Sequence, residues 1–144
     1  MKVIKEIEKF HDEMTIWRRD IHRHPELAFE EKRTSDFVAE KLKEFEIEIH
    51  RGLAKTGVVG TIRNGDGRSI GLRADLDALP LEEKNTFEHA SVNQGKMHAC
   101  GHDGHTTMLL GAAKYLAESK NFLGTVHFIF QPAEEGGGGG DIMV

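Results

Sequence analysis

Apolar residues recur at spacings of four and three residues near the start of the chain. The stripe consists of Val3, Ile7, Phe10, Met14, Trp17 and Ile21. This spacing places them on one face of an α-helix, and the stripe is short for a coiled coil, so we expect the helix to pack on a sheet. Pro25 disfavours a helical conformation at His24 and marks the end of the region. We interpret His22 and His24, near this helix terminus, as structural residues and not as ligands.

Two further helical patterns follow. One runs from about Glu30 to Phe45, with an apolar face that we expect to be buried at Val38, Leu42 and Phe45. Its charged residues are interpreted as a solvated face: Glu31, Lys32, Glu40 and Lys43. The other runs from Thr106 to Glu118, and its apolar face consists of Met108, Leu109, Ala112, Ala113 and Leu116. Gly111 permits close approach of a neighbouring element to this second helix.

Short apolar segments between the helices predict strands. Ile47 and Ile49 alternate with glutamates, as in a strand with one wet face. Segments 57–62 and 69–74 flank Asn-Gly-Asp-Gly at 64–67, which predicts a hairpin. Segment 124–131 is almost continuously apolar, which is typical of a central strand covered on both faces. Residues 81–96 show no period and predict a surface loop.

Together these patterns predict one α/β domain with a mixed sheet flanked by helices. The length of 144 residues, with 38% hydrophobic and 30% charged residues, is ordinary for one soluble domain. A net charge of -5 without a run of Lys and Arg disfavours nucleic acid as a partner. We expect no membrane span and no signal peptide, and the single cysteine allows no internal disulfide, so the expected location is the cytoplasm.

Chemistry-bearing residues are concentrated in Met-His-Ala-Cys-Gly-His-Asp-Gly-His at 97–105. A lone cysteine is usually an inert thiol and a loop histidine is usually solvated. Crowding favours a metal site instead, because thiolate, imidazole and carboxylate are the side chains that bind transition metals. Cys100 and His102 alternate around Gly101, so in an extended loop their side chains point the same way.

Carboxylates follow two of the predicted strands. Asp75 and Asp77 come at the end of one, and Glu134 and Glu135 come just after another. The carboxyl ends of strands are where open α/β sheets place their sites, although the two aspartates are equally compatible with an ordinary turn. A hydrolytic metal site needs an acidic ligand and a carboxylate that takes a proton from water, and adjacent glutamates can divide those tasks.

Four segments, in this order, closely resemble the peptidase M20 amidohydrolases, in the branch of hippurate hydrolases, indole-acetyl-amino-acid (IAA-amino-acid) hydrolases and N-acyl-amino-acid deacylases. They are Arg-Asp-Ile-His-Arg-His-Pro-Glu-Leu at 19–27, Leu-Arg-Ala-Asp-Leu-Asp-Ala-Leu-Pro at 72–80, the segment 97–105, and Gln-Pro-Ala-Glu-Glu-Gly-Gly at 131–137. The resemblance implies a zinc-peptidase-like catalytic domain. It also implies a metal-dependent hydrolase that cleaves the amide of N-acyl-amino acids or small peptides.

The resemblance implies Cys100, His102 and Glu135 as metal ligands and Glu134 as the general base. It implies two divalent cations in a complete site, with zinc, manganese, cobalt and nickel all open as identities. Asp75 stands where more distant two-metal relatives carry a histidine ligand, so it is not assigned as a ligand. For Asp77 we expect a role in orienting a ligand or the glutamate pair. The roles of His98 and His105 stay open.

Members of this family are longer than this chain. We therefore expect residues 1–144 to be the N-terminal portion of the catalytic domain, without its C-terminal part or the inserted smaller domain that closes the site and forms a homodimer. We expect this portion to be incomplete and inactive as an enzyme by itself. An alternative is a non-catalytic product that binds a metal or a partner. A structural Cys/His metal module is disfavoured, because such sites usually have four closed protein ligands and only one cysteine is available.

Overall fold

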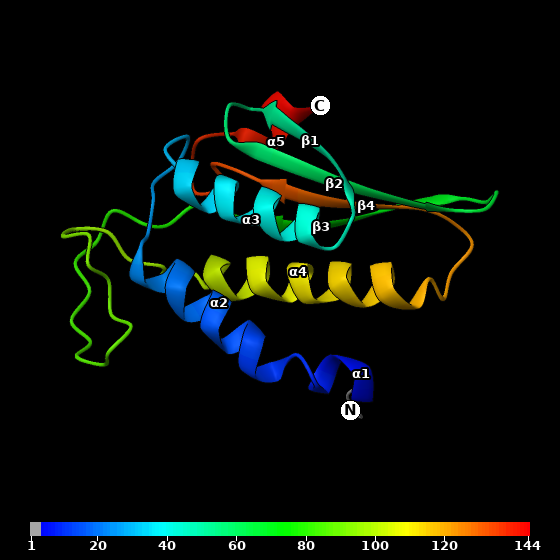
Figure 1. Cartoon of the computed structure of the whole chain (residues 1–144). Helices are drawn as coiled ribbons and strands as arrows, with labels where there is room; N and C mark the ends of the chain where they lie inside the picture. The colour runs from blue at the N-terminus through cyan, green and yellow to red at the C-terminus, as the bar shows by residue number, and fades with distance from the viewer. Residues whose placement is uncertain (1–3) are drawn as a thin grey trace.

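The structure is a computed structural model that describes residues 4–144, so the first position of the apolar stripe, Val3, lies outside the described residues. Figure 1 shows a sheet with helices packed below it. The elements in chain order are α1 (Lys5–Glu8), α2 (His11–Arg23), α3 (Lys32–Glu44), β1 (Glu48–Leu53), β2 (Gly57–Asn64), β3 (Ser69–Asp75), α4 (His102–Ser119), β4 (Gly124–Gln131) and α5 (Gly139–Met143). None of these helices is long and apolar enough to cross a membrane.

The sheet is mixed, as the sequence predicted. Its strand order is β1-β2-β4-β3, with β4 antiparallel to β2 and parallel to β3. The prediction of an α/β domain with a mixed sheet flanked by helices is therefore confirmed. The central position of β4 agrees with its apolar sequence, because this strand has a hydrogen-bonded neighbour on each side.

The expected hairpin around residues 64–67 is wrong. Both flanking segments are strands, but β4 lies between them, and β2 instead forms an antiparallel pair with β1. The turn after β2 passes over the start of β4, where Thr125 N donates to the Arg68 carbonyl oxygen at 3.0 Å. A side chain at Gly124 would collide with that oxygen. Turn residues therefore predicted the reversal, but they carried no information about a later strand inserting between the two.

The N-terminal helix departs from prediction in two ways. The expected single helix is divided into α1 and α2 at Lys9 and Phe10. In addition, α2 packs mainly against α4, whereas α3 and α4 lie against the sheet (Figure 1). Gly111 allows the α2–α4 contact, because a side chain there would begin 2.7 Å from the Met14 sulfur. The apolar stripe therefore faces another helix, which offers an equivalent apolar surface.

Only one face of β4 is fully covered. Val126, Phe128 and Phe130 are buried in the core, while Thr125, His127 and Ile129 on the other face are half-buried. The expectation of complete coverage on both faces is thus wrong for residues 4–144. Met108 is 59% exposed, so it also does not belong to the buried face of its helix.

One charged residue lies in a different environment from the predicted one. Glu31 was expected on a solvated face, but it is 0% exposed at the start of α3. Helical periodicity does not extend reliably to the residue before the first turn, where the chain changes direction. Two positions earlier, Phe29 has a positive φ of 62°, so the backbone turns shortly before α3.

Candidate metal centre

The candidate ligands come from three segments that meet at one edge of the sheet. β3 ends at Asp75, β4 ends at Gln131 just before Glu134 and Glu135, and α4 begins at His102. α4 thus begins four residues earlier than the sequence predicted. Gly101, with a φ of 92°, turns the chain into the helix and leaves Cys100 in the preceding loop. Parallel pairing of β3 with β4 brings their carboxyl ends together.

The three expected metal ligands lie close together. Donor atoms of Cys100, His102 and Glu135 are all within 4.8 Å of one another. The distance from His102 Nε2 to Glu135 Oε1 is 3.8 Å. Two ligands of a tetrahedral zinc ion, with bonds of roughly 2.0 to 2.3 Å, are separated by about 3.3 to 3.8 Å. This donor set therefore fits one divalent cation after small side-chain movements.

His102 is held in an orientation that suits metal binding. Its ring is 2% exposed, and Nδ1 lies 2.7 Å from the carbonyl oxygen of Asp77, to which the N–H donates. That bond selects the tautomer in which Nε2 keeps its lone pair. Burial lowers the pKa of His102, but the Asp77 hydrogen bond and the charge of Asp75 outweigh it and raise the pKa overall.

Asp77 accepts hydrogen bonds from the backbone of both glutamates. Its Oδ1 accepts the N–H of Glu134 at 3.0 Å, and its Oδ2 accepts the N–H of Glu135 at 2.9 Å. The carboxylate is 1% exposed. Burial raises its pKa, but hydrogen bonds from His102 and the two amides outweigh burial, so the pKa is lowered and the group stays ionised. This contact is the one expected of a residue that orients the pair.

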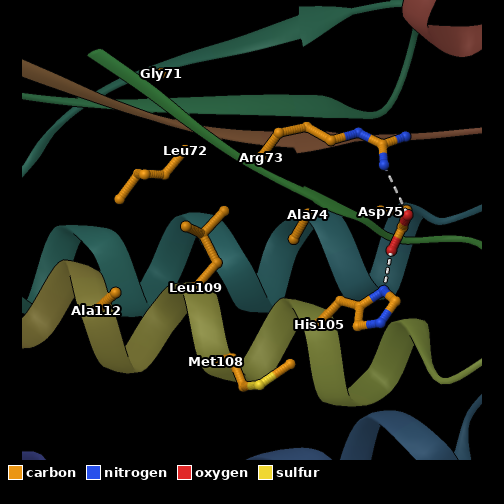
Figure 2. Close-up of a pocket in the computed structure, with 9 residues that line it drawn as sticks. All are labelled: Gly71, Leu72, Arg73, Ala74, Asp75, His105, Met108, Leu109 and Ala112. Atoms are coloured by element: carbon orange, nitrogen blue, oxygen red, sulfur yellow. Dashed lines mark hydrogen bonds and ion pairs between the residues drawn. The ribbon is translucent and has the colours of Figure 1, made fainter.

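Asp75 belongs to a second group of possible donors, together with His102 and His105, whose ligand atoms also lie within 4.8 Å of one another. Asp75 accepts from His105 Nδ1 at 2.7 Å and from the Arg73 guanidinium at 2.9 Å. Figure 2 shows these contacts at one end of a groove of about 560 Å³ between β3 and α4. The sequence left the roles of Asp75 and His105 open, and their closeness to His102 depends on where α4 begins.

The two glutamates differ in solvent access. The Glu134 side chain is 41% exposed and the Glu135 side chain is 24% exposed. Both carboxylates approach His102 Nε2 at 3.8 Å. A carboxylate that accepts a proton from water has to be reached by that water, and this requirement agrees with the general-base role that the resemblance implies for Glu134.

Cys100 lies at the exposed side of the centre. A hydrogen bond with Glu135, burial and the neighbouring carboxylates raise the pKa of its thiol to about 11. The surrounding carboxylates therefore oppose formation of a thiolate. A divalent cation would compensate this negative charge and favour the thiolate, which is the form that binds metal.

A further buried cluster lies behind the start of α4. His22 Nδ1 is 2.9 Å from Asp103 Oδ2, and His22 Nε2 is 3.1 Å from Glu83 Oε1. His98 is 4% exposed, neither of its ring nitrogens has a hydrogen-bond partner among residues 4–144, and burial lowers its pKa to about 4. His22 is therefore held between two carboxylates, which lie 61 and 81 positions away in the sequence and carried no local signal.

His22 makes stability depend on pH. The Asp103 hydrogen bond, assisted by Glu83, outweighs burial and raises the pKa of His22 above its usual value of about 6.5. The stabilisation is therefore fully present below about pH 6.5 and is lost as the pH rises through the folded-state pKa. In chelator-treated protein, we expect the free energy of unfolding to fall as the pH rises above about 6.5. We expect a smaller fall in His22→Gln. Exposed His50→Gln is the control, and equal slopes in wild type and His22→Gln would contradict the expectation.

Comparison with protein families gives an independent result. Peptidase family M20/M25/M40 matches residues 71–144, which include all the candidate ligands. Hippurate hydrolase of Campylobacter jejuni is 52% identical over 145 residues, covering 100% of this chain and 38% of the relative. An N-acyl-L-amino acid amidohydrolase of Geobacillus stearothermophilus is 47% identical over 137 residues, covering 91% of this chain and 37% of the relative.

Solved structures give a consistent result. Bacillus subtilis YXEP, described as a dinuclear metal-binding peptidase of the M20 family, superimposes with a TM-score of 0.85 at 46% identity, covering 89% of this chain and 37% of that protein. A putative aminohydrolase from methicillin-resistant Staphylococcus aureus gives a TM-score of 0.93 at 41% identity, covering 96% of this chain and 36% of that protein. The chain spans a little over a third of the length of these relatives.

Proposed function

The chain belongs to Peptidase family M20/M25/M40, and on that premise we propose that it forms part of a metal-dependent amidohydrolase for N-acyl-amino acids or small peptides. The observation that carries the proposal is the approach of the Cys100, His102 and Glu135 donors to within 4.8 Å of one another, beside a second carboxylate. In this proposal, residues 1–144 form the N-terminal portion of an M20-type catalytic domain.

Each residue has a distinct task in the proposed reaction. Cys100, His102 and Glu135 would hold a divalent cation, which when bound supplies polarisation of the amide carbonyl and lowers the pKa of water. Glu134 accepts the proton of the attacking water and passes it to the leaving nitrogen. Asp77 fixes the backbone of both glutamates and, through its carbonyl oxygen, the tautomer of His102.

The relatives guide the choice of substrate and cation. The substrate class follows the names of the hippurate hydrolase and the N-acyl-L-amino acid amidohydrolase. We propose two cations in the complete site, in keeping with the dinuclear description of YXEP, and zinc, manganese, cobalt and nickel are the candidates. We also propose a cytoplasmic location, because a thiol that binds metal has to stay reduced.

The first part of the test measures metal binding. Zinc is titrated into the chain in competition with a chromophoric chelator, and wild type is compared with Cys100→Ala and with exposed His50→Gln. We expect weaker binding only in Cys100→Ala, because that variant removes one of three donors. Equal affinity in all three proteins would contradict the proposed ligand set.

The second part measures hydrolysis. A chimera carries this chain in place of the matched segment of Campylobacter hippurate hydrolase, and release of amino acid is followed from benzoyl-, acetyl- and indoleacetyl-amino acids. We expect turnover that a chelator abolishes and added metal restores. A folded, metal-loaded chimera that hydrolyses none of these amides would contradict the proposed reaction and would favour a metal-binding role without turnover.

A further inference from the structure

Glu31 is a buried carboxylate that lies outside the candidate metal centre. It immediately precedes α3 and is 0% exposed. Its Oε2 accepts a hydrogen bond from Thr56 Oγ1 at 2.6 Å, and its Oε1 accepts the backbone N–H of Ala133 at 2.8 Å. Burying a carboxylate is costly unless it is well paired, and these two bonds supply the pairing. Glu31 therefore connects the β1–β2 turn to the segment that follows β4.

The amide that Glu31 holds belongs to a residue in an unusual conformation. Ala133 has a φ of 53°, in the left-handed region that residues with a Cβ seldom adopt. The residue is 0% exposed, and its carbonyl oxygen accepts the N–H of Gly139 at 3.1 Å. Such a conformation persists only where the surroundings determine it. Here Glu31 binds the N–H of Ala133 and Gly139 binds its carbonyl oxygen, so both peptide groups of Ala133 are held in place.

Three consecutive backbone N–H groups after β4 donate hydrogen bonds to buried carboxylates. Ala133 donates to Glu31, and the next two amides donate to the two oxygens of Asp77. The directions of these N–H groups fix the directions in which the side chains of Glu134 and Glu135 leave the chain. Asp77 fixes the backbone of Glu134 and Glu135 directly. Glu31 fixes the backbone of Ala133, the residue that immediately precedes them.

We propose that Glu31 is a positioning residue for the glutamate pair, keeping Ala133 left-handed so that Glu135 reaches the metal and Glu134 reaches the water. This inference rests on the proposed function. Glu31 is buried and its carboxylate is bonded to Thr56 and Ala133, so its loss should act through the geometry of the pair. Loss of a residue that orients ligands typically weakens metal binding or activity by about 10- to 100-fold.

Two substitutions separate positioning from general stability. Glu31→Leu keeps the bulk but removes both acceptors, so we expect zinc affinity of the chain to fall by about 10- to 100-fold. In the chimera, kcat should fall more than KM rises. Glu31→Gln can still accept from Ala133 and donate to Thr56, so it should retain most of the affinity. Val38→Ala, at a fully buried position of α3, the helix that Glu31 precedes, is the control for lost stability.

The inference is overturned if Glu31→Leu binds zinc no more weakly than Val38→Ala at a similar loss of stability. A measurement on the unmodified chain covers the case in which Glu31→Leu does not fold. Hydrogen exchange at the Ala133 amide should be slow, although this residue lies outside every helix and strand. Fast exchange in a chain that binds metal would overturn the inference alone, whereas a chain that binds no metal would overturn the proposed function as well.

Discussion

Glu134→Gln in the chimera is expected to reduce kcat by about 10² to 10⁴-fold while the metal content stays unchanged, because the substitution removes a proton acceptor of the water and no ligand. The structure supports this separation. Glu134 is the more exposed of the two glutamates, and only Glu135 belongs to the three-donor group with Cys100 and His102. The hydrogen bond between Asp77 and Glu134 uses the backbone N–H of Glu134, so the substitution leaves that bond in place.

Glu135→Gln is the matched control for this prediction. It removes one of the three donors, so metal affinity should fall together with activity. The test combines steady-state kinetics with metal analysis of the purified proteins. Loss of metal from Glu134→Gln with retention in Glu135→Gln would show that the two glutamates exchange roles.

Phe128→Ala is expected to lower the free energy of unfolding by about 3–5 kcal/mol, a large fraction of the total stability of a domain. Phe128 is 0% exposed on the central strand, where it is in register with Gly60 of β2 and Leu72 of β3. Its side chain belongs to the core cluster shared with α3 and α4. Removing the ring leaves a cavity that neighbours on the sheet and on the helices cannot readily fill.

Leu123→Ala provides the control for Phe128→Ala. Leu123 is 79% exposed just before the same strand, so its truncation should change stability by no more than about 0.5 kcal/mol. Chemical denaturation of both variants gives the comparison. Equal stability losses at the two positions would contradict the central placement of β4.

Local signals were sufficient for most elements of this fold. The segment 124–131 was predicted with the bounds that β4 has, because glycine and proline punctuate a nearly continuous apolar run. Local signals did not predict the order of the strands in the sheet. The glycines at 65 and 67 indicated a reversal, but the insertion of β4 between β2 and β3 depends on pairing with residues about 60 positions away.

Residue types and the family resemblance indicated the candidate site, but they did not indicate its supporting contacts. Cys100, His102 and Glu135 could be chosen because their chemistry suits a metal and their motifs resemble a family. The burial of Glu31 and its bond to Ala133 join residues 102 positions apart and had no counterpart in the helical pattern. The early start of α4 likewise placed His105 beside Asp75 in a way that spacing alone did not specify.

X-ray absorption at the zinc edge of the zinc-loaded chain tests most directly whether Cys100, His102 and Glu135 form a metal site. The expected result is a shell that contains one sulfur at about 2.3 Å together with nitrogen and oxygen at about 2.0 to 2.2 Å. The sulfur should disappear in Cys100→Ala, which provides the control. A shell of nitrogen and oxygen alone, identical in wild type and Cys100→Ala, would contradict the assignment.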